Sequence, residues 1–147
     1  MSHTIKRTQY QTTTPVGLYE ANFRRLNRLL PDISKMPAGE CLELPDGGTA
    51  IVILEQFKYT TLISLKQVFD TRFRHLSSIE MDLRICHDAR LLEVVGYQGR
   101  NPVQSALYYP NKHMLQLDEK KQLNLLLKEI LETSIRIKRH FTQHLVS

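Results

Sequence analysis

The chain has 147 residues and a net charge of +5, from 20 basic and 15 acidic side chains. Its length suits one domain with a sizeable core, and its 41% apolar and 24% charged content is ordinary for a water-soluble globular protein. The longest uninterrupted apolar run, Ala50 to Leu54, is far too short for a membrane span, so no membrane partner is expected.

The cysteine content and the first residues point to a cytoplasmic protein. Cys41 and Cys86 are the only two cysteines and have no metal-ligand spacing, which suits a reducing compartment better than a disulfide-stapled secreted domain. Residues 1–14 are polar and rich in threonine, without the apolar stretch of a signal peptide. We expect them to form a flexible segment before a single domain at residues 15–147.

The first predicted element is a helix. Thr14 and Pro15 suit its N-cap and first position, and Pro31 ends it. Helical spacing predicts a buried stripe of four side chains, namely Tyr19, Phe23, Leu26 and Leu30.

A run of strand-like segments follows this helix. The segments are residues 40–44, 49–57, 60–69, 79–85 and 91–97. Pro45-Asp46-Gly47-Gly48 is a strong hairpin turn, and the alternation of Ile79, Met81, Leu83 and Ile85 with charged residues predicts a sheet with one buried face. Because the connections are short, we expect an antiparallel meander.

A long helix is predicted from Asp118 onward. Its expected apolar stripe is Leu123, Leu126, Leu127, Ile130, Ser134, Ile137 and Phe141. Its opposite face is expected to carry Lys121, Lys128, Glu132, Arg136 and Arg139. The order of elements predicts an α+β fold, with a five-stranded antiparallel meander sheet and both helices packed on one face.

Cys86-His87-Asp88 has the residue types of a nucleophile, a base and an orienting acid. Neighbours on a strand point to opposite faces, so Cys86 and His87 do not readily share a hydrogen bond. The pattern favours a half-buried His87 and a turn at Asp88-Ala89, although His87 stays a catalytic candidate.

The start of the last helix gathers several polar candidates. Helical geometry directs Glu119 toward the core side, places Asp118 and Gln122 together on one flank, and places Asn124 on the other. Glu119 could accept hydrogen bonds from backbone N–H groups at the helix start. It could instead line a cavity beside His87 and Tyr109, where burial would tune it for proton transfer.

Further binding candidates lie in the preceding loop and in the first helix. Tyr109-Pro110-Asn111 suits either a pinned turn or an aromatic wall for a ligand. Asn22, at the edge of the first apolar stripe, is more often a satisfied core amide than a ligand contact.

Basic residues gather near the C-terminus, at Arg136, Lys138 and Arg139. Cations are favoured near a helix C-terminus, so the run is typical of a stabilised helix end. The alternative is phosphate or RNA binding, but aromatic residues for base stacking are scarce there, which makes a nucleic-acid partner unlikely. Leu125 is expected on the exposed side, which hints at a homodimer.

Several stretches resemble a known family. They are Asn22-Phe23 with Leu26 and Arg28-Leu29-Leu30-Pro31; Tyr59-Thr60-Thr61-Leu62; His87-Asp88-Ala89 with Glu93-Val94; Tyr109-Pro110-Asn111-Lys112; and Asp118-Glu119-Lys120 with Gln122 and Asn124. In shared order and spacing they are similar to the YqiB-like family of small proteobacterial proteins of unknown function. The resemblance implies a cytosolic bacterial protein and brings no established activity or cofactor.

Three functions are compatible with these patterns. The first is a non-enzymatic domain that binds an unidentified small molecule or protein. The second is a small hydrolase of a phosphate-bearing metabolite, with Glu119 or Asp118 as base or metal ligand and His87 assisting. The third is weak nucleic-acid binding through Arg136, Lys138, Arg139 and the arginines of the first helix. No metal site and no cofactor can be named, because no phosphate-loop, dinucleotide, serine-elbow or zinc motif is present.

Overall fold

The computed structural model describes residues 14–68, 78–99 and 117–146. Its elements are α2 (Pro15–Leu29), the 3-10 turn η1 (Ile33–Lys35), β1 (Cys41–Glu43), β2 (Thr49–Gln56), β3 (Thr60–Val68), β4 (Ser78–Cys86), β5 (Leu91–Gly99) and α4 (Leu117–Val146). The expected flexible segment at residues 1–14 lies outside the described residues, except for Thr14. Tyr109 and Asn111 also lie outside them.

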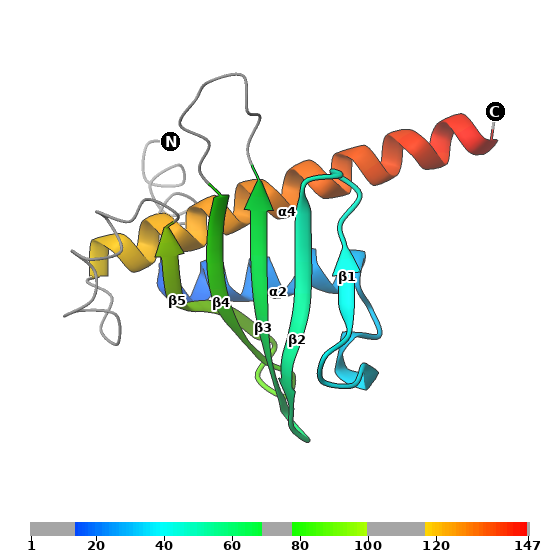
Figure 1. The fold of residues 1–147 in the computed structure, drawn as a ribbon. Helices are drawn as coiled ribbons and strands as arrows, with labels where there is room; N and C mark the ends of the chain where they lie inside the picture. The colour runs from blue at the N-terminus through cyan, green and yellow to red at the C-terminus, as the bar shows by residue number, and fades with distance from the viewer. Residues whose placement is uncertain (1–13, 69–77, 100–116, 147) are drawn as a thin grey trace, which may run out of the picture.

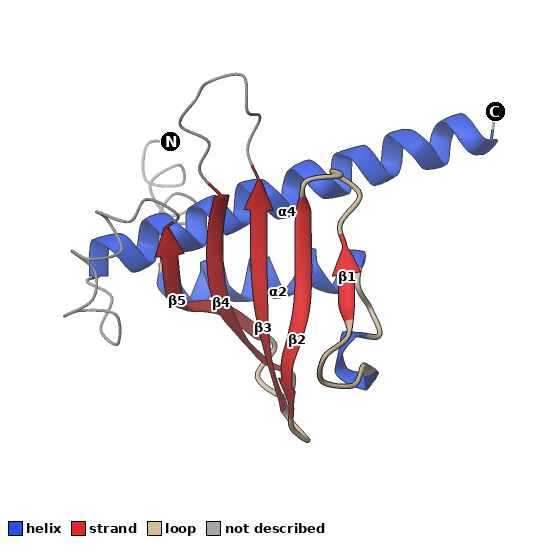
Figure 2. Ribbon diagram, viewed as in Figure 1, coloured by secondary structure: helices blue, strands red, loops and turns tan. Residues whose placement is uncertain are grey.

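The strands form one sheet in the order β1-β2-β3-β4-β5, and every neighbouring pair is antiparallel. Both helices lie against the same face of this sheet (Figures 1 and 2). The predicted α+β meander with helices on one face is therefore confirmed.

Two turns show how local sequence sets the strand connections. Between β1 and β2, Asp46 accepts hydrogen bonds from the backbone N–H groups of Gly48 and Thr49, both at 3.0 Å. Gly47 has a φ of 76°, which glycine adopts without steric cost. Between β4 and β5, Asp88 accepts a hydrogen bond from Ala89 N–H, so the predicted turn at these residues is confirmed.

The core lies between the sheet and the helices. Met81, Leu83 and Ile85 of β4 are fully buried, while Asp82 and Arg84 between them are exposed. This alternation confirms the predicted half-buried sheet. The buried side chains of the sheet form one cluster with Leu26, Leu127 and Leu131 of the helices, among others.

The buried stripe of α2 differs from the predicted one. The helix buries Leu18, Asn22, Leu26 and Leu29. Tyr19, Phe23 and Leu30 are only partly buried. The prediction was wrong because it placed the polar Asn22 at the edge of the stripe, whereas Asn22 is fully buried at its centre.

The buried stripe of α4 also lies at a different rotation about the helix axis from the predicted stripe. Asn124, Leu131 and Ile135 are buried, whereas Leu126 and Ile137 are only partly buried. The prediction of Asn124 on a flank is therefore wrong, and so is that of an exposed Leu125, which is also partly buried. Here too, a buried asparagine lies where the apolar pattern was interrupted. In the described part of the chain, no helix is both long and apolar enough to cross a membrane.

Candidate functional site

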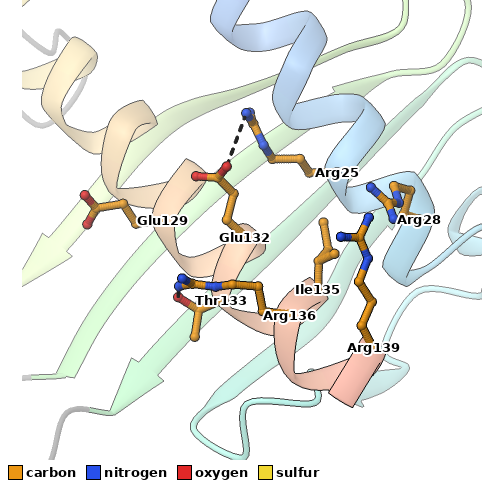
Figure 3. Close-up of a pocket in the computed structure, with 8 residues that line it drawn as sticks. All are labelled: Arg25, Arg28, Glu129, Glu132, Thr133, Ile135, Arg136 and Arg139. Atoms are coloured by element: carbon orange, nitrogen blue, oxygen red, sulfur yellow. Dashed lines mark hydrogen bonds and ion pairs between the residues drawn. The ribbon is translucent and has the colours of Figure 1, made fainter. Parts of the chain in front are cut away.

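A charged groove lies between α2 and α4, and we call it the arginine groove (Figure 3). Its volume is about 460 Å³. Its lining residues are Arg25 and Arg28 of α2, and Glu129, Glu132, Thr133, Ile135, Arg136 and Arg139 of α4. The charged side chains are four arginines and two glutamates, so the lining carries a net charge of +2.

Helical spacing brings these arginines together. Arg25 and Arg28 are three residues apart on α2, and Arg136 and Arg139 are three residues apart on α4. Side chains at this spacing are neighbours on a helix surface. The packing of α2 against α4 brings the two arginine pairs to one groove (Figure 3).

The four arginines differ in their partners. Arg25 donates from Nη1 to Asn22 Oδ1 at 3.0 Å and pairs with Glu132 Oε2 at 3.8 Å. Arg136 donates to Thr133 Oγ1 at 3.2 Å. The guanidinium groups of Arg28 and Arg139 have no hydrogen bond or ion pair with the residues that the structure describes. The groove therefore holds two guanidinium groups without an ion pair among the described residues and a net positive charge, which is an arrangement that attracts an anion.

The helix dipole does not account for Arg136 and Arg139. Helix α4 runs to Val146, ten residues beyond Arg136 and seven beyond Arg139. The dipole effect falls off within the last turn of a helix, so neither arginine is close enough to benefit. This observation weakens the reading of the basic run as a stabilised helix end.

Two buried asparagines join α2, α4 and β5, and one of them, Asn22, accepts the hydrogen bond from Arg25 of the groove. Asn22 Nδ2 donates to the backbone oxygen of Asn124 at 3.0 Å. Asn124 Nδ2 donates to Lys120 O at 2.7 Å, and Asn124 Oδ1 accepts from Val94 N–H at 3.1 Å. We call this set the asparagine junction. Its amides are fully buried and hydrogen-bonded, as buried polar groups require.

The hydrogen bond from Val94 N–H to a side chain lies next to a bulge in the edge strand β5, where Val95 is the extra residue. The register of β4 and β5 shifts between the pairs Asp82–Gly96 and Leu83–Val94. A bulge leaves one residue unpaired and disrupts the ladder locally. Asn124 supplies the acceptor that the Val94 N–H group needs at this point.

The edge of the junction carries an ion-pair network. Glu93 accepts hydrogen bonds from Lys120 at 2.8 Å and from Arg84. Burial acts to raise the pKa of Glu93, but these two cations outweigh it and hold the pKa below 4.5. Lys120 Nζ also lies 5.6 Å from the centre of the Tyr19 ring.

The other candidates at the start of α4 do not form a described pocket. Asp118 lies in the first turn of the helix. Glu119 is half-buried and Gln122 is exposed, and neither bonds to a residue within the described ranges. Glu119 does not line the pocket of His87, and Tyr109 lies outside the described residues. The hydrolase arrangement of Glu119, His87 and Tyr109 is thus not assembled by the described part of the chain.

His87 takes part in a separate network on the core side of the sheet. Gln56 Nε2 donates to Ile33 O at 2.9 Å and to Met36 O at 2.8 Å, so its other amide atom is the oxygen. Thr61 donates its one hydroxyl proton to that oxygen. His87 Nε2 lies 2.6 Å from Thr61 Oγ1. Because the hydroxyl proton of Thr61 is already donated to Gln56, His87 Nε2 carries a proton and donates it to Thr61 Oγ1.

The surroundings of His87 suit a structural role better than a substrate site. Burial lowers the pKa of His87, although Asp88 opposes the shift, so the ring is neutral near pH 7. The pocket beside it, between the end of α2, η1 and Ile85, has a volume of only about 50 Å³. A volume of this size holds a water molecule or two. Cys86 lies on the opposite face and is not part of this network.

No group of three possible metal ligands occurs in the described ranges. Sequence reasoning identified Arg136, Arg139 and the first-helix arginines but missed Glu129 and Thr133. The sequence signal for the groove was the spacing of three residues between arginines on both helices. On α4, two glutamates with the same spacing precede the arginines.

Comparisons with known proteins place the chain in a family. Residues 25–140 match the model of a family described as "Protein of unknown function (DUF1249)". The chain is 32% identical over 114 residues to the uncharacterized protein YqiB of Escherichia coli K12, and equally to that of Escherichia coli O157:H7. The match covers 78% of this chain and 81% of each relative. No solved structure matches. The chain therefore belongs to the DUF1249 family, and its similarity to YqiB confirms the resemblance predicted from the sequence.

Proposed function

We propose that this chain is a cytoplasmic, non-enzymatic binding domain whose arginine groove takes a phosphate-bearing small molecule. The observation that carries the proposal is the pair Arg28 and Arg139, whose guanidinium groups line the groove without an ion pair or hydrogen bond among the described residues. The free thiols of Cys41 and Cys86 support the cytoplasmic assignment.

The chemistry of the lining favours phosphate over other ligands. A guanidinium group is planar, always charged, and matches the oxygens of phosphate with two parallel hydrogen bonds. Arg25 is held by Asn22 and Glu132, so less side-chain freedom is lost when it binds a ligand. The groove volume of about 460 Å³ lies in the range of small-molecule sites, roughly 300 to 1,000 Å³.

Binding without turnover is favoured by most of the residues that line the groove, Glu129 being the lining carboxylate without an ion pair in the described ranges. Arginines are permanently protonated and do not act as bases. Glu132 is paired with Arg25, and the hydroxyl of Thr133 accepts from Arg136. The candidate base His87 lines a different pocket.

Calorimetric titration with inorganic phosphate, diphosphate and nucleoside monophosphates tests the proposal. The double variant Arg28→Ala/Arg139→Ala is expected to bind the best of these ligands at least tenfold more weakly. Its control, Arg24→Ala/Lys121→Ala, removes the same charge from exposed positions outside the groove, one on each helix, and should bind as the unchanged protein does.

Two results would overturn the proposal. Equal losses in both double variants would show that only the overall charge attracts the anion. Millimolar ligands that give no heat with the unchanged protein would exclude a phosphate site in the groove. Conversion of a bound phosphate ester, detected by mass spectrometry and abolished in Arg28→Ala/Arg139→Ala, would contradict the non-enzymatic part and favour the hydrolase.

A further inference from the structure

The arginine groove is polarised along its length. Glu129 lies at one end, and Arg28 and Arg139 lie at the other (Figure 3). Glu129 precedes Arg139 by ten residues, which at a rise of 1.5 Å per residue corresponds to about 15 Å along the axis of α4. The guanidinium of Arg136 lies between the two ends, because its side chain runs back to Thr133.

The two glutamates of the groove have different partners. Glu132 is paired with Arg25 at 3.8 Å, so its charge is partly balanced. Glu129 is exposed and makes no hydrogen bond or ion pair with any residue in the described ranges. Its carboxylate is a free acceptor at the end of the groove opposite Arg28 and Arg139.

Thr133 adds a donor beside this acceptor. It lies one helical turn after Glu129, at the spacing where side chains on a helix meet. Its hydroxyl oxygen accepts from Arg136 at 3.2 Å, which leaves its own proton available to a ligand.

A groove with this polarity rejects one class of anion and accepts another. The carboxylate of Glu129 repels a phosphate placed beside it. A nucleic-acid strand, which carries phosphates along its whole length, therefore fits the groove poorly. The same carboxylate accepts hydrogen bonds from N–H or O–H groups, as in its pairing with exocyclic amines of bases.

We infer that the ligand of the arginine groove is a small phosphate ester whose far end carries N–H or O–H donors, such as a nucleoside or amino-sugar monophosphate. Arg28 and Arg139 bind the phosphate, while Glu129 and Thr133 select the other end. This inference rests on the proposed function, because it names the class of ligand for the same groove.

The test compares ligands with and without the donor end. Calorimetry on the full chain uses inorganic phosphate, guanosine monophosphate and glucosamine 6-phosphate as probes. We expect at least one of the two esters to bind tenfold or more tightly than inorganic phosphate. Glu129→Gln should reduce that preference at least fivefold, and should leave the affinity for inorganic phosphate unchanged or higher.

A matched substitution separates selection from general charge. Glu20→Gln removes one negative charge from an exposed position of α2 outside the groove, and should leave the preference intact. If Glu129→Gln changes the affinity for all three probes by the same factor, the inference is overturned, whereas the proposed phosphate site stands. If Arg28→Ala/Arg139→Ala has no effect on any probe, the proposed function itself fails.

A single-stranded oligonucleotide provides the opposing case. The inference predicts that a 12-nucleotide strand binds more weakly per molecule than the better ester at physiological salt. A strand that binds more tightly than both esters, and more weakly after Arg28→Ala/Arg139→Ala, would overturn the inference in favour of a nucleic-acid surface.

Discussion

The asparagine junction and the arginine groove lie next to each other on the same two helices, but their polar groups differ in burial and in hydrogen bonding. In the junction, the amide groups of Asn22 and Asn124 are fully buried and bonded to backbone or side-chain partners. In the groove, Arg28 and Arg139 have no partner among the described residues. Arg25 belongs to both, since it lines the groove and donates a hydrogen bond to Asn22.

The contrast separates groups that stabilise the fold from groups available to a ligand. A buried polar group without a partner costs about 1 to 3 kcal/mol, so the junction must be satisfied for the chain to fold. Exposed arginines have no such requirement, and two like charges close together slightly oppose folding. Substitutions in the junction should therefore change stability, whereas those in the groove should change binding.

The largest expected effect is at Asn124. Asn124→Ala removes the acceptor for Val94 N–H and the donor to Lys120 O, and leaves a small cavity. We expect the free energy of unfolding to fall by about 2 to 4 kcal/mol. Urea denaturation followed by circular dichroism measures the change.

Gln122→Ala is the control for this substitution, because Gln122 is exposed on the same helix and has no partner in the described ranges. Its effect should stay within about 0.5 kcal/mol. An Asn124→Ala protein as stable as Gln122→Ala would contradict the role that we assign to the junction.

A smaller effect is expected at Glu93, on the edge of the junction. Glu93→Gln weakens the hydrogen bonds with Lys120 and Arg84 and should lower the free energy of unfolding by about 1 kcal/mol at pH 7. The pKa of Glu93 is held below its ordinary 4.5 in the folded state, despite its burial. The stabilisation is therefore fully present above pH 4.5 and is lost as the pH falls through the folded-state pKa.

The measurement is the difference in unfolding free energy between Glu93→Gln and the unchanged protein at several pH values. The difference should be constant from pH 6 to pH 8 and should shrink toward zero below pH 4.5. A difference that grows on acidification would show that Glu93 is not ionised in its network at neutral pH.

The difference between the junction and the groove also shows which features of the fold could be predicted from the sequence. The strands were predictable because each signal is local, as in the alternation around Met81 and Leu83 and the turn chemistry at Asp46 and Gly47. The helices themselves were predictable, but the rotation of each was not. Both buried stripes pass through an asparagine, and a method that counts apolar residues turns the helix away from a polar one.

The site was harder to predict from the sequence, because contacts between distant segments of the chain decide which residues form it. Asn22 and Asn124 are 102 residues apart, and their bond decides that both amides are buried. The arginines were visible in sequence, but only the packing of α2 against α4 joins them in one groove with Glu129. His87 was predicted correctly as half-buried, because it directly follows β4 and continues the alternation of that strand.

The smallest expected change in stability accompanies a large expected loss of binding. Arg28→Ala/Arg139→Ala should leave the free energy of unfolding within about 0.5 kcal/mol of the unchanged protein, or raise it slightly, because two unpaired like charges are removed. Urea denaturation at low and at high salt checks this result, and any gain should fade as salt screens the charges. A loss of more than about 1 kcal/mol would mean that these arginines stabilise the fold, and the weaker phosphate binding of the variant could then reflect unfolding. A stable variant that no longer binds would assign the two arginines to the ligand, because the loss of binding could not then be attributed to unfolding.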